Sequence, residues 1–562
     1  MSEVMEDLQS NIKSSIINAL NRAKDKGVLH FEAIPEFVLE VPRDKSHGDF
    51  ATNIAMQLAK HARKAPRAIA QDILDHMDTQ GTYIKEMEIA GPGFINFKLD
   101  TSWLYQVLRD IQTKGDAYGR INRGKGKRVN VEFVSANPTG PMHMGNARGG
   151  ALGDSLAAVL SAAGYEVSRE FYINDAGNQI ERFGESLEAR YLQLLGQDAQ
   201  VPEGGYQGED ITQHMREFIE LHGDRYLDVD PETRREVFIQ YALKKNVEQL
   251  RRDLEDYGIR FDTWFSEQKL HDSKGVEETI QLLIQRGHTY EKEGALWFEA
   301  SKFGGDKDEV LVRNNGIPTY FAADIAYHRN KLETRDFDLA INIWGADHHG
   351  HVARLKGALE AVGIDPSRLE VIIMQLVRLL RDGEVARMSK RKGKAITLAD
   401  LVEEVGRDAA RFFFNMRSAD SHLDFDLDLA VKQSNENPVF YVQYAHARIC
   451  SILRQMAAEG ITRDVIRTAR PELLKEEPEI QLMYKLAELP QEIEIAARNL
   501  EPSRITRYIL DVASLFHSFY NACRVRVEDE DLMKARLLLV VSTKQVLYNV
   551  LNLLGIQAPE RM

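Results

Sequence analysis

Residues 129–154 read VNVEFVSANPTGPMHMGNARGGALGD, and this stretch decides the fold. Apolar residues alternate from Val129 to Phe133 as in a β-strand, and those from Leu152 onward recur at helical spacing. A second alternating strand is predicted at 167–173. A strand, a loop, a helix and a strand in this order open a doubly wound parallel sheet. Ligands of such sheets bind at the carboxyl ends of the strands, where the loop is expected to lie.

The same pattern returns later in the chain. LAINIW (339–344) predicts an apolar strand, and VIIMQLV (371–377) predicts another after an intervening helix. Residues 178–260 are helical in pattern and highly charged, so we interpret them as an insertion into this core. The sequence therefore predicts an α/β multidomain protein whose core is a Rossmann-type doubly wound parallel sheet.

A further domain is predicted on each side of the core. Residues 1–115 open with a helical apolar face and contain an alternating strand after the turn Gly91-Pro92-Gly93, which indicates an α+β domain. The core itself is expected to span 116–436. Residues 437–562 show helical periodicity alone, which predicts an all-α helical bundle.

Composition excludes several classes of protein. The 562 residues are 43% hydrophobic and 28% charged, unlike disordered, collagenous or coiled-coil chains. Two cysteines cannot form a disulfide framework. No apolar run approaches the roughly 20 residues that span a bilayer. The polar, acidic start is unlike a signal or transit peptide. A soluble protein of the reducing cytoplasm is expected. The net charge of −14 argues against binding nucleic acid by charge alone.

The loop before the helix suits a nucleotide. Gly145 has no side chain, so an adenine ring could lie against the backbone there. His143 can donate a hydrogen bond to phosphate oxygens, and a helix N-terminus adds positive potential. A glycine-rich turn whose histidine is bonded internally fits the same spacing equally well.

A second candidate segment is RMSKRKGK (387–394), which holds five cations in eight residues. Such a loop could stabilise charge on phosphates during transfer. A solvated basic surface loop is the commoner explanation of a charge run. The two segments are far apart in sequence, so they support one another only if the fold brings them together.

Asp347, His348, His349 and His351 form a third cluster. Three histidines and an aspartate resemble metal ligands. Because the cluster follows the apolar strand 339–344 of a nucleotide-binding sheet, a nucleotide-binding loop is the alternative to a metal site.

The first two segments together resemble the HIGH and KMSKS motifs of class I aminoacyl-tRNA synthetases. The wider stretch VEFVSANPTGPMHMGNARGGALGD (131–154) resembles the arginyl-tRNA synthetase family, and the likeness extends over nearly the whole chain. It includes these segments: HGDFATNIA (47–55), IAGPGFINF (89–97), VLVRNNGIPTYFAADIAYH (310–328), IWGADHHGHVARLKGAL (343–359), NPVFYVQYAHARICSIL (437–453) and LNLLGIQAPERM (551–562). Asn146 stands where HIGH has its last histidine, and Arg387 where KMSKS begins with lysine.

The resemblance implies roles for matching residues. Catalytic residues would be His143, Asn146 and Lys390. ATP-binding residues would be His143, Gly145, Asn146, Gly345, Asp347, His348, Met388 and Lys390. Arginine-binding residues would be Glu132, Asn137, Tyr320, Asp324 and His348. A guanidinium is planar and always charged, so it suits a carboxylate such as Asp324, and a tyrosine four residues earlier on a helix lies on the same face.

The resemblance also implies an arginine–tRNA ligase. It would use ATP together with Mg²⁺, and the protein itself would have no dedicated metal site. It would bind tRNA(Arg) but no membrane, and it would act as a monomer in the cytoplasm. Residues 1–115 would contact tRNA and 437–562 would bind the anticodon. Two alternatives stay open: another adenylyl-transferring enzyme of class I, and a non-catalytic RNA-binding paralogue.

Overall fold

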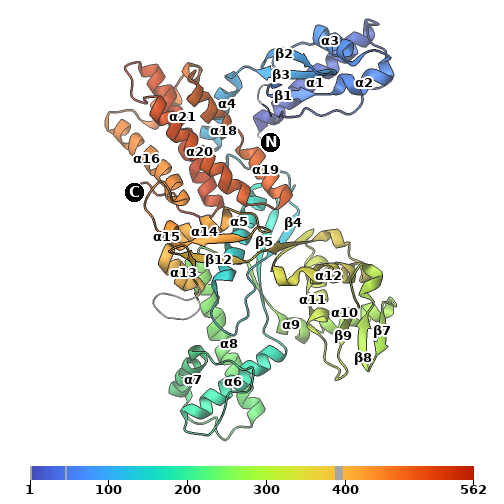
Figure 1. Ribbon diagram of the computed structural model, residues 1–562, viewed down its shortest axis with the longest axis vertical. Helices are drawn as coiled ribbons and strands as arrows, with labels where there is room; N and C mark the ends of the chain where they lie inside the picture. Colours follow the sequence, from blue (N-terminus) through green and yellow to red (C-terminus); the bar gives the residue numbers. More distant parts are fainter. Residues whose placement is uncertain (1–2, 43, 45–46, 387–395) are drawn as a thin grey trace.

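A five-stranded parallel sheet lies at the centre of the molecule (Figure 1). This computed structural model describes residues 3–42, 44, 47–386 and 396–562. The strand order is β11-β10-β4-β5-β6, and every pairing is parallel. The strands are β4 (Arg128–Glu132), β5 (Glu166–Ile173), β6 (Thr263–Ser266), β10 (Leu339–Gly345) and β11 (Leu369–Met374). The predicted doubly wound sheet is confirmed, and the order of its strands reverses between β4 and β10, where such sheets bind ligands.

Helix α5 (Met144–Ala162) follows β4 and packs directly on it. A Cβ atom on Gly153 would lie 2.2 Å from the ring of Phe133, and one on Gly150 would lie 2.8 Å from Ile259. Glycine at these positions therefore lets the helix lie close to the strand. Because α5 begins at the carboxyl end of β4, this packing fixes the place of its N-terminus.

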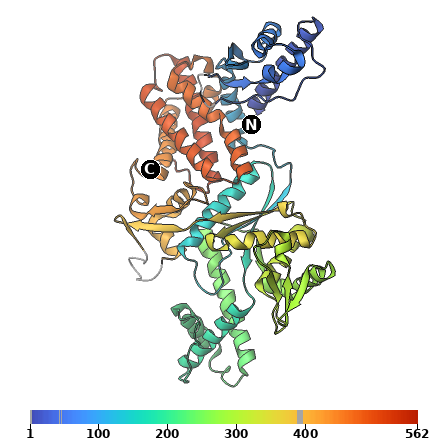
Figure 2. The same cartoon turned by 45° about the vertical axis from the view of Figure 1, so that its right-hand side comes forward.

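The N-terminal region is an α+β unit, as predicted. Its antiparallel sheet has the order β1-β3-β2. The elements are α1 (Glu3–Asp25), β1 (Phe50–Thr52), α2 (Ile54–Ala62), α3 (Pro66–His76), β2 (Ile84–Ala90), β3 (Phe94–Leu99) and α4 (Ser102–Lys114). The sheet and its first three helices project from one end of the molecule, whereas α4 contacts the C-terminal helices (Figures 1 and 2).

Two insertions interrupt the sheet. Between β5 and β6, helices α6 (Asn178–Leu194), α7 (Glu209–His222) and α8 (Pro231–Asp256) enclose their own apolar core, which agrees with the predicted helical insertion. Between β6 and β10 lies a second insertion, which the sequence pattern did not indicate. It contains α9 (Glu267–Asp272), α10 (Gly275–Gln285), β7 (Thr289–Lys292), β8 (Ala295–Phe298), β9 (Glu309–Val312) and α11 (Tyr320–Arg329). The two insertions form separate lobes below the sheet (Figures 1 and 2).

The predicted single strand VIIMQLV is wrong. Helix α12 (His349–Ala361) precedes β11, which ends at Met374. The Gln375 N–H donates to Ala419 O, so the chain leaves the parallel sheet there. A second sheet, β13-β12-β14, follows, and three helices accompany it. These elements are β12 (Val377–Arg381), β13 (Glu384–Val385), α13 (Leu398–Val405), α14 (Arg407–Asn415), β14 (Leu423–Asp426) and α15 (Leu427–Ala430).

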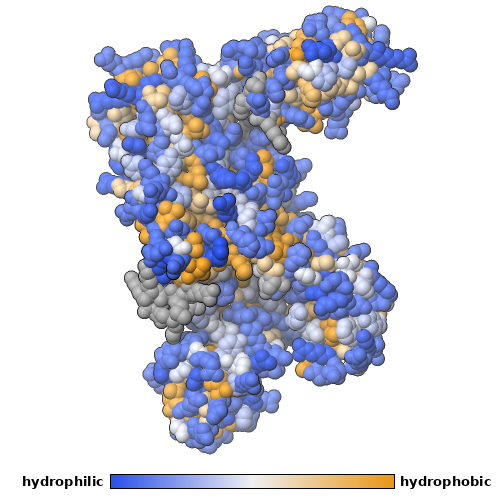
Figure 3. Space-filling view, viewed as in Figure 1, coloured by the Kyte–Doolittle hydropathy of each residue, from blue (hydrophilic) through white to orange (hydrophobic). Residues whose placement is uncertain are grey.

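The C-terminal region is a helical bundle, as predicted. It contains α16 (Pro438–Ala458), α17 (Arg463–Arg467), α18 (Glu477–Ala487), α19 (Leu489–Asn499), α20 (Ser503–Ala522) and α21 (Glu530–Leu553). Among the described residues, no helix is both long and apolar enough to cross a membrane. The face seen in Figure 3 is mostly polar, and its apolar patches are most prominent across the middle of the molecule.

Candidate active site

A cavity of about 900 Å³ opens at the carboxyl ends of β4, β5 and β10. Its lining residues come from the loop after β4, the start of α5, the end of β10, and helices α11 and α12. The segment between α6 and α7 also contributes Tyr206 and Gly208, and the start of α7 contributes Asp210. The cavity therefore lies at the carboxyl ends of the strands, where the sequence pattern predicted the ligand site, and beside the point where the strand order reverses.

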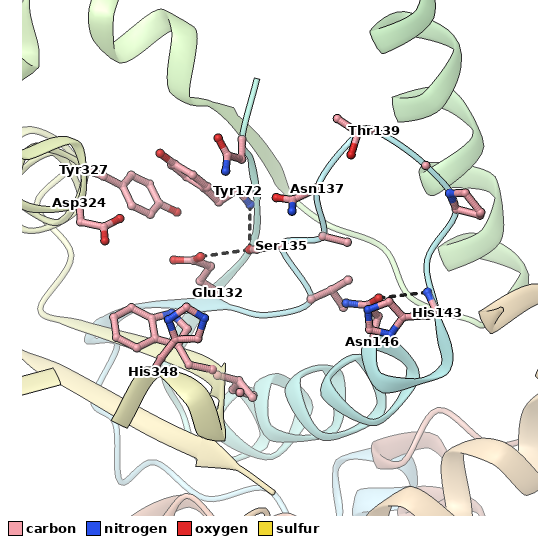
Figure 4. Close-up of a pocket in the computed structure, with 18 of the residues that line it drawn as sticks. Glu132, Ser135, Asn137, Thr139, His143, Asn146, Tyr172, Asp324, Tyr327 and His348 are labelled. Atoms are coloured by element: carbon pink, nitrogen blue, oxygen red, sulfur yellow. Dashed lines mark hydrogen bonds between the residues drawn. The ribbon is translucent and has the colours of Figure 1, made fainter. Parts of the chain in front are cut away.

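The loop after β4 begins with a strained turn. Val134 and Ser135 have φ angles of 68° and 41°, in the left-handed region that residues other than glycine rarely occupy. The Ser135 N–H donates to Phe133 O at 2.9 Å, which closes the turn. Ser135 Oγ donates to Glu132 Oε1 at 3.0 Å and accepts from the Tyr172 N–H at 3.1 Å. Such strain is typical of functional sites, and here it directs the loop across the cavity (Figure 4).

His143 and Asn146 lie together at the N-terminus of α5 and line the cavity (Figure 4). The His143 N–H donates to Asn146 Oδ1 at 3.2 Å, so asparagine closes the first turn of the helix. A Cβ atom on Gly145 would lie 3.2 Å from the imidazole ring of His143, so glycine leaves room for that ring. The arrangement presents a helix N-terminus and an exposed histidine, which suits a phosphate group.

The fold brings the residues that follow the basic segment to this helix. Residues 387–395, and with them Met388 and Lys390, lie outside the described residues. Directly after them, Ile396 O accepts from the Met144 N–H at 3.2 Å, and the Leu398 N–H donates to Met142 O at 2.9 Å. The residues that directly follow the basic segment are thus joined to the first candidate segment by backbone hydrogen bonds.

Asp324 of α11 lines the opposite end of the cavity (Figure 4). Its Oδ2 lies 2.8 Å from Nε2 of His351. Tyr320 lies on the same helix face, with its ring centroid 6.2 Å from that of His351. Tyr320 is 68% exposed, however, and it does not occur among the described residues that line the cavity. Asp324 therefore reaches the expected pocket, whereas Tyr320 lies at its outside.

Glu132 lies buried at the end of β4 and borders the cavity. Lys331, whose side chain is fully buried, donates to Glu132 Oε2 at 2.6 Å and to Asn342 Oδ1 at 3.1 Å. The charge of Glu132 is therefore balanced within the protein, which the sequence did not indicate. Asn137 is an exposed residue of the cavity wall.

Further carboxylates and two tyrosines surround the Asp324 end. Burial raises the pKa of Glu267, and the negative charge of Asp324 adds to this effect. Burial raises the pKa of Tyr172 as well, with Glu267 and Asp324 contributing. Tyr327 donates to Glu170 Oε1 at 2.5 Å, and Arg335 pairs with the same carboxylate, so the charge of Glu170 is balanced within the protein. The mutual repulsion of Glu267 and Asp324 in a poorly solvated region favours a cationic ligand.

The residues after β10 do not converge on one point. Gly345 and His348 line the cavity, and the ring of His348 lies 5.8 Å from that of Trp344. His351 also lines the cavity and contacts Asp324, whereas His349 lines a different cavity. The side chain of Asp347 lies outside the described residues. In the described part of the chain, no group of three or more histidine, cysteine or acidic residues gathers in a metal-binding arrangement.

Three family models match the chain in succession. They are the arginyl tRNA synthetase N terminal domain at residues 10–99, the class I (R) tRNA synthetase catalytic domain at 108–434, and the DALR anticodon binding domain at 442–562. The catalytic model alone matches more than half of the chain.

Similar proteins agree with these matches over the full length. The arginine–tRNA ligase of Caldanaerobacter subterraneus is 61% identical over 562 residues, and that of Ruminiclostridium cellulolyticum is 61% identical over 564, with 100% of each chain covered. The Thermus thermophilus arginyl-tRNA synthetase structure shares the fold with a TM-score of 0.73 at 23% identity, covering 99% of this chain and 100% of that one. The chain therefore belongs to the arginyl-tRNA synthetase family, the class I ligases that activate arginine with ATP and transfer it to tRNA(Arg).

Proposed function

We propose that the cavity binds arginine and ATP side by side, with the guanidinium of arginine at Asp324 and the phosphates of ATP at the N-terminus of α5. The observation that carries this proposal is that the two ends of the cavity favour ligand groups of opposite charge. One end is acidic and the other has a helix N-terminus with His143 and Asn146 (Figure 4). A cation and a polyanion would each meet the complementary end.

At the acidic end, Asp324 accepts hydrogen bonds from the guanidinium while His351 supports its other oxygen. Glu132, Asn137 and His348 lie along the path between the two ends and are proposed to contact the arginine main chain. Tyr320 is proposed to cover the arginine from outside.

At the other end, His143 and Asn146 bind the phosphates, and Gly145 allows the nucleotide to approach the helix. Gly345, Asp347 and His348 are proposed to lie beside the ribose and adenine. Met388 and Lys390 complete the site from the basic segment, whose following residues Ile396 and Leu398 are bonded to the α5 start.

In the first step, a carboxylate oxygen of arginine attacks the α-phosphorus of ATP in line, and pyrophosphate leaves. In the second step, a hydroxyl of the terminal ribose of tRNA attacks the activated carbonyl, and AMP leaves. His143, Asn146 and Lys390 stabilise charge that develops on the phosphates, and positioning supplies the rest. Mg²⁺ is proposed to enter with the phosphates and to neutralise part of their charge.

The remaining regions are proposed to serve tRNA. Residues 1–115 would contact the body of tRNA(Arg), and 437–562 would bind its anticodon. The catalytic region would span 116–436. We further propose a monomer that works in the cytoplasm.

Aminoacylation assays test the proposal. Arginine should be attached to tRNA(Arg), whereas lysine and citrulline, which lack the guanidinium, should not; canavanine, which keeps it, should compete. His143→Ala should lower kcat/KM for ATP. Arginine-dependent pyrophosphate exchange should be negligible until tRNA(Arg) is added. Charging of lysine would favour another class I enzyme, and tRNA binding without charging would favour a non-catalytic paralogue.

A further inference from the structure

The helical insertion holds the nucleotide loop by a buried hydrogen bond. Asn246 of α8 is 7% exposed, and its Nδ2 donates to Pro138 O at 2.8 Å. Proline has no N–H group, so this carbonyl is its single polar backbone atom. The contact joins residues 108 positions apart and lies five residues before His143.

The orientation of the Asn246 side chain is fixed by both of its partners. Since a carbonyl can only accept, the amide NH₂ group must face Pro138. Asn246 Oδ1 then faces α7, where Nε2 of His214 lies 2.7 Å away and donates to it. His214, Asn246 and Pro138 thus form one chain of hydrogen bonds from α7 through α8 to the loop.

The loop is held near both of its ends by the sheet and by the segment after residue 395. Ser135 ties its start to β4 and β5, and Met142 pairs with Leu398 at its end. Asn246 acts between these anchors, at the part of the loop that crosses the cavity. The neighbouring Thr139 and Gly140 line that cavity together with Asp210 of the insertion.

We propose that Asn246 is a positioning residue for ATP binding, and that the 178–260 insertion contributes to the first reaction step through this contact. The inference rests on the proposed binding of ATP at the start of α5. With the Pro138 carbonyl fixed, the segment from Thr139 to His143 has a defined path when ATP arrives. Without it, part of the binding energy would be spent on ordering the loop.

The test is Asn246→Asp. Aspartate keeps the size of the side chain and the acceptor for His214, but it removes the donor to Pro138 and places an oxygen against the carbonyl. We expect kcat/KM for ATP in aminoacylation to fall about tenfold or more, as for the loss of one buried hydrogen bond. The KM for arginine should change less than about twofold.

A matched control separates positioning from folding. Phe218→Leu loosens the apolar core of the insertion, where Phe218 packs against Tyr191 and Phe238, without touching Pro138. It should lower the thermal midpoint and leave kcat/KM for ATP within about twofold. An equal kinetic loss in both variants, or an unchanged value in Asn246→Asp, would overturn the inference. If His143→Ala impairs ATP use and Asn246→Asp does not, this inference alone fails; if His143→Ala has no effect, the proposed site fails.

Discussion

Asp324 and His351 meet at the acidic end of the cavity, where Asp324 Oδ2 lies 2.8 Å from His351 Nε2. The contact joins α11 to α12, so it fixes the carboxylate relative to the strand that precedes α12. The side chain of Asp324 is 28% exposed, against 10% for that of His351. The carboxylate is thus held in one orientation while one side remains open to a ligand.

Asp324→Asn should raise the KM for arginine about 10- to 100-fold, because a hydrogen bond to a charged group contributes about 1.5–3 kcal/mol. Asparagine keeps the shape of the side chain and removes the charge that a guanidinium needs. Steady-state aminoacylation with arginine varied measures the effect, and the KM for ATP serves as the internal control. An unchanged KM for arginine would show that the guanidinium binds elsewhere.

Arg411→Met should lower the thermal midpoint by about 5–10 °C. Arg411 is fully buried, donates to Leu554 O at 2.8 Å, and lies 2.5 Å from an Asp154 oxygen. It therefore ties the end of α21 to α5. Removing one member of a buried ion pair costs about 3–5 kcal/mol, and Arg169, 2.9 Å from Asp154, offsets part of this cost.

Differential scanning fluorimetry measures the midpoint, and Arg378→Met is the matched control. Arg378 also pairs with a carboxylate, Asp424, but both side chains are largely exposed, so the midpoint should fall by less than about 2 °C. Equal shifts in the two variants would contradict the special role of the buried pair.

Stability should fall as the pH is lowered below about 6.5. Burial, with the charge of Lys331, holds the pKa of His328 well below its ordinary value of 6.5, and His328 contacts Asp324 O and Asn342. In the folded state His328 stays neutral, whereas the unfolded chain binds a proton below pH 6.5, so protons favour unfolding. Burial lowers the pKa of His446 and His517 in the same direction.

Thermal midpoints between pH 8 and pH 5 test this expectation. The wild-type midpoint should be highest above the unfolded pKa and should fall steadily below it. His328→Gln should be less stable at pH 8 but should show a shallower decline toward pH 5, because one of the three histidines no longer titrates. A decline as steep as that of the wild type would mean that His328 does not contribute.

Much of the fold could be predicted because burial imposes a period on the sequence. The helical periodicity of residues 437–562 is visible in α20, which buries one apolar face from Ile505 to Phe519. The unit from β4 to β5 follows the predicted alternation. The second insertion escaped prediction because its strands β7, β8 and β9 have four residues each. Strands that short carry too few alternations to stand out.

The site could be predicted only where a motif marks it. His143, Asn146 and Asp324, for which the resemblance implied binding roles, line one cavity, and those roles stay predictions. Lys331 and Ser135 could not be found in this way. The buried ion pair of Lys331 with Glu132 and the positive φ angle of Ser135 depend on contacts between distant segments. Local sequence specifies which residues face inward but does not identify their partners.

Lys390→Ala should lower kcat about 10²- to 10³-fold, which is the usual cost of losing one group that stabilises a transition state. Negative charge builds up on the phosphate oxygens as pyrophosphate leaves, and a lysine near the α-phosphorus would offset it. Lys390 lies six residues before Ile396, whose carbonyl accepts from the Met144 N–H.

Single-turnover formation of the adenylate in the presence of tRNA(Arg) measures this step directly. Lys392→Ala, which removes a cation from the same segment, is the control and should change the rate less than about threefold. Lys390→Arg should recover part of the rate, because arginine keeps the positive charge but spreads it over a planar guanidinium. If Lys390→Ala retained the wild-type rate and Lys392→Ala did not, the catalytic cation would lie two residues further along the segment than the resemblance implies.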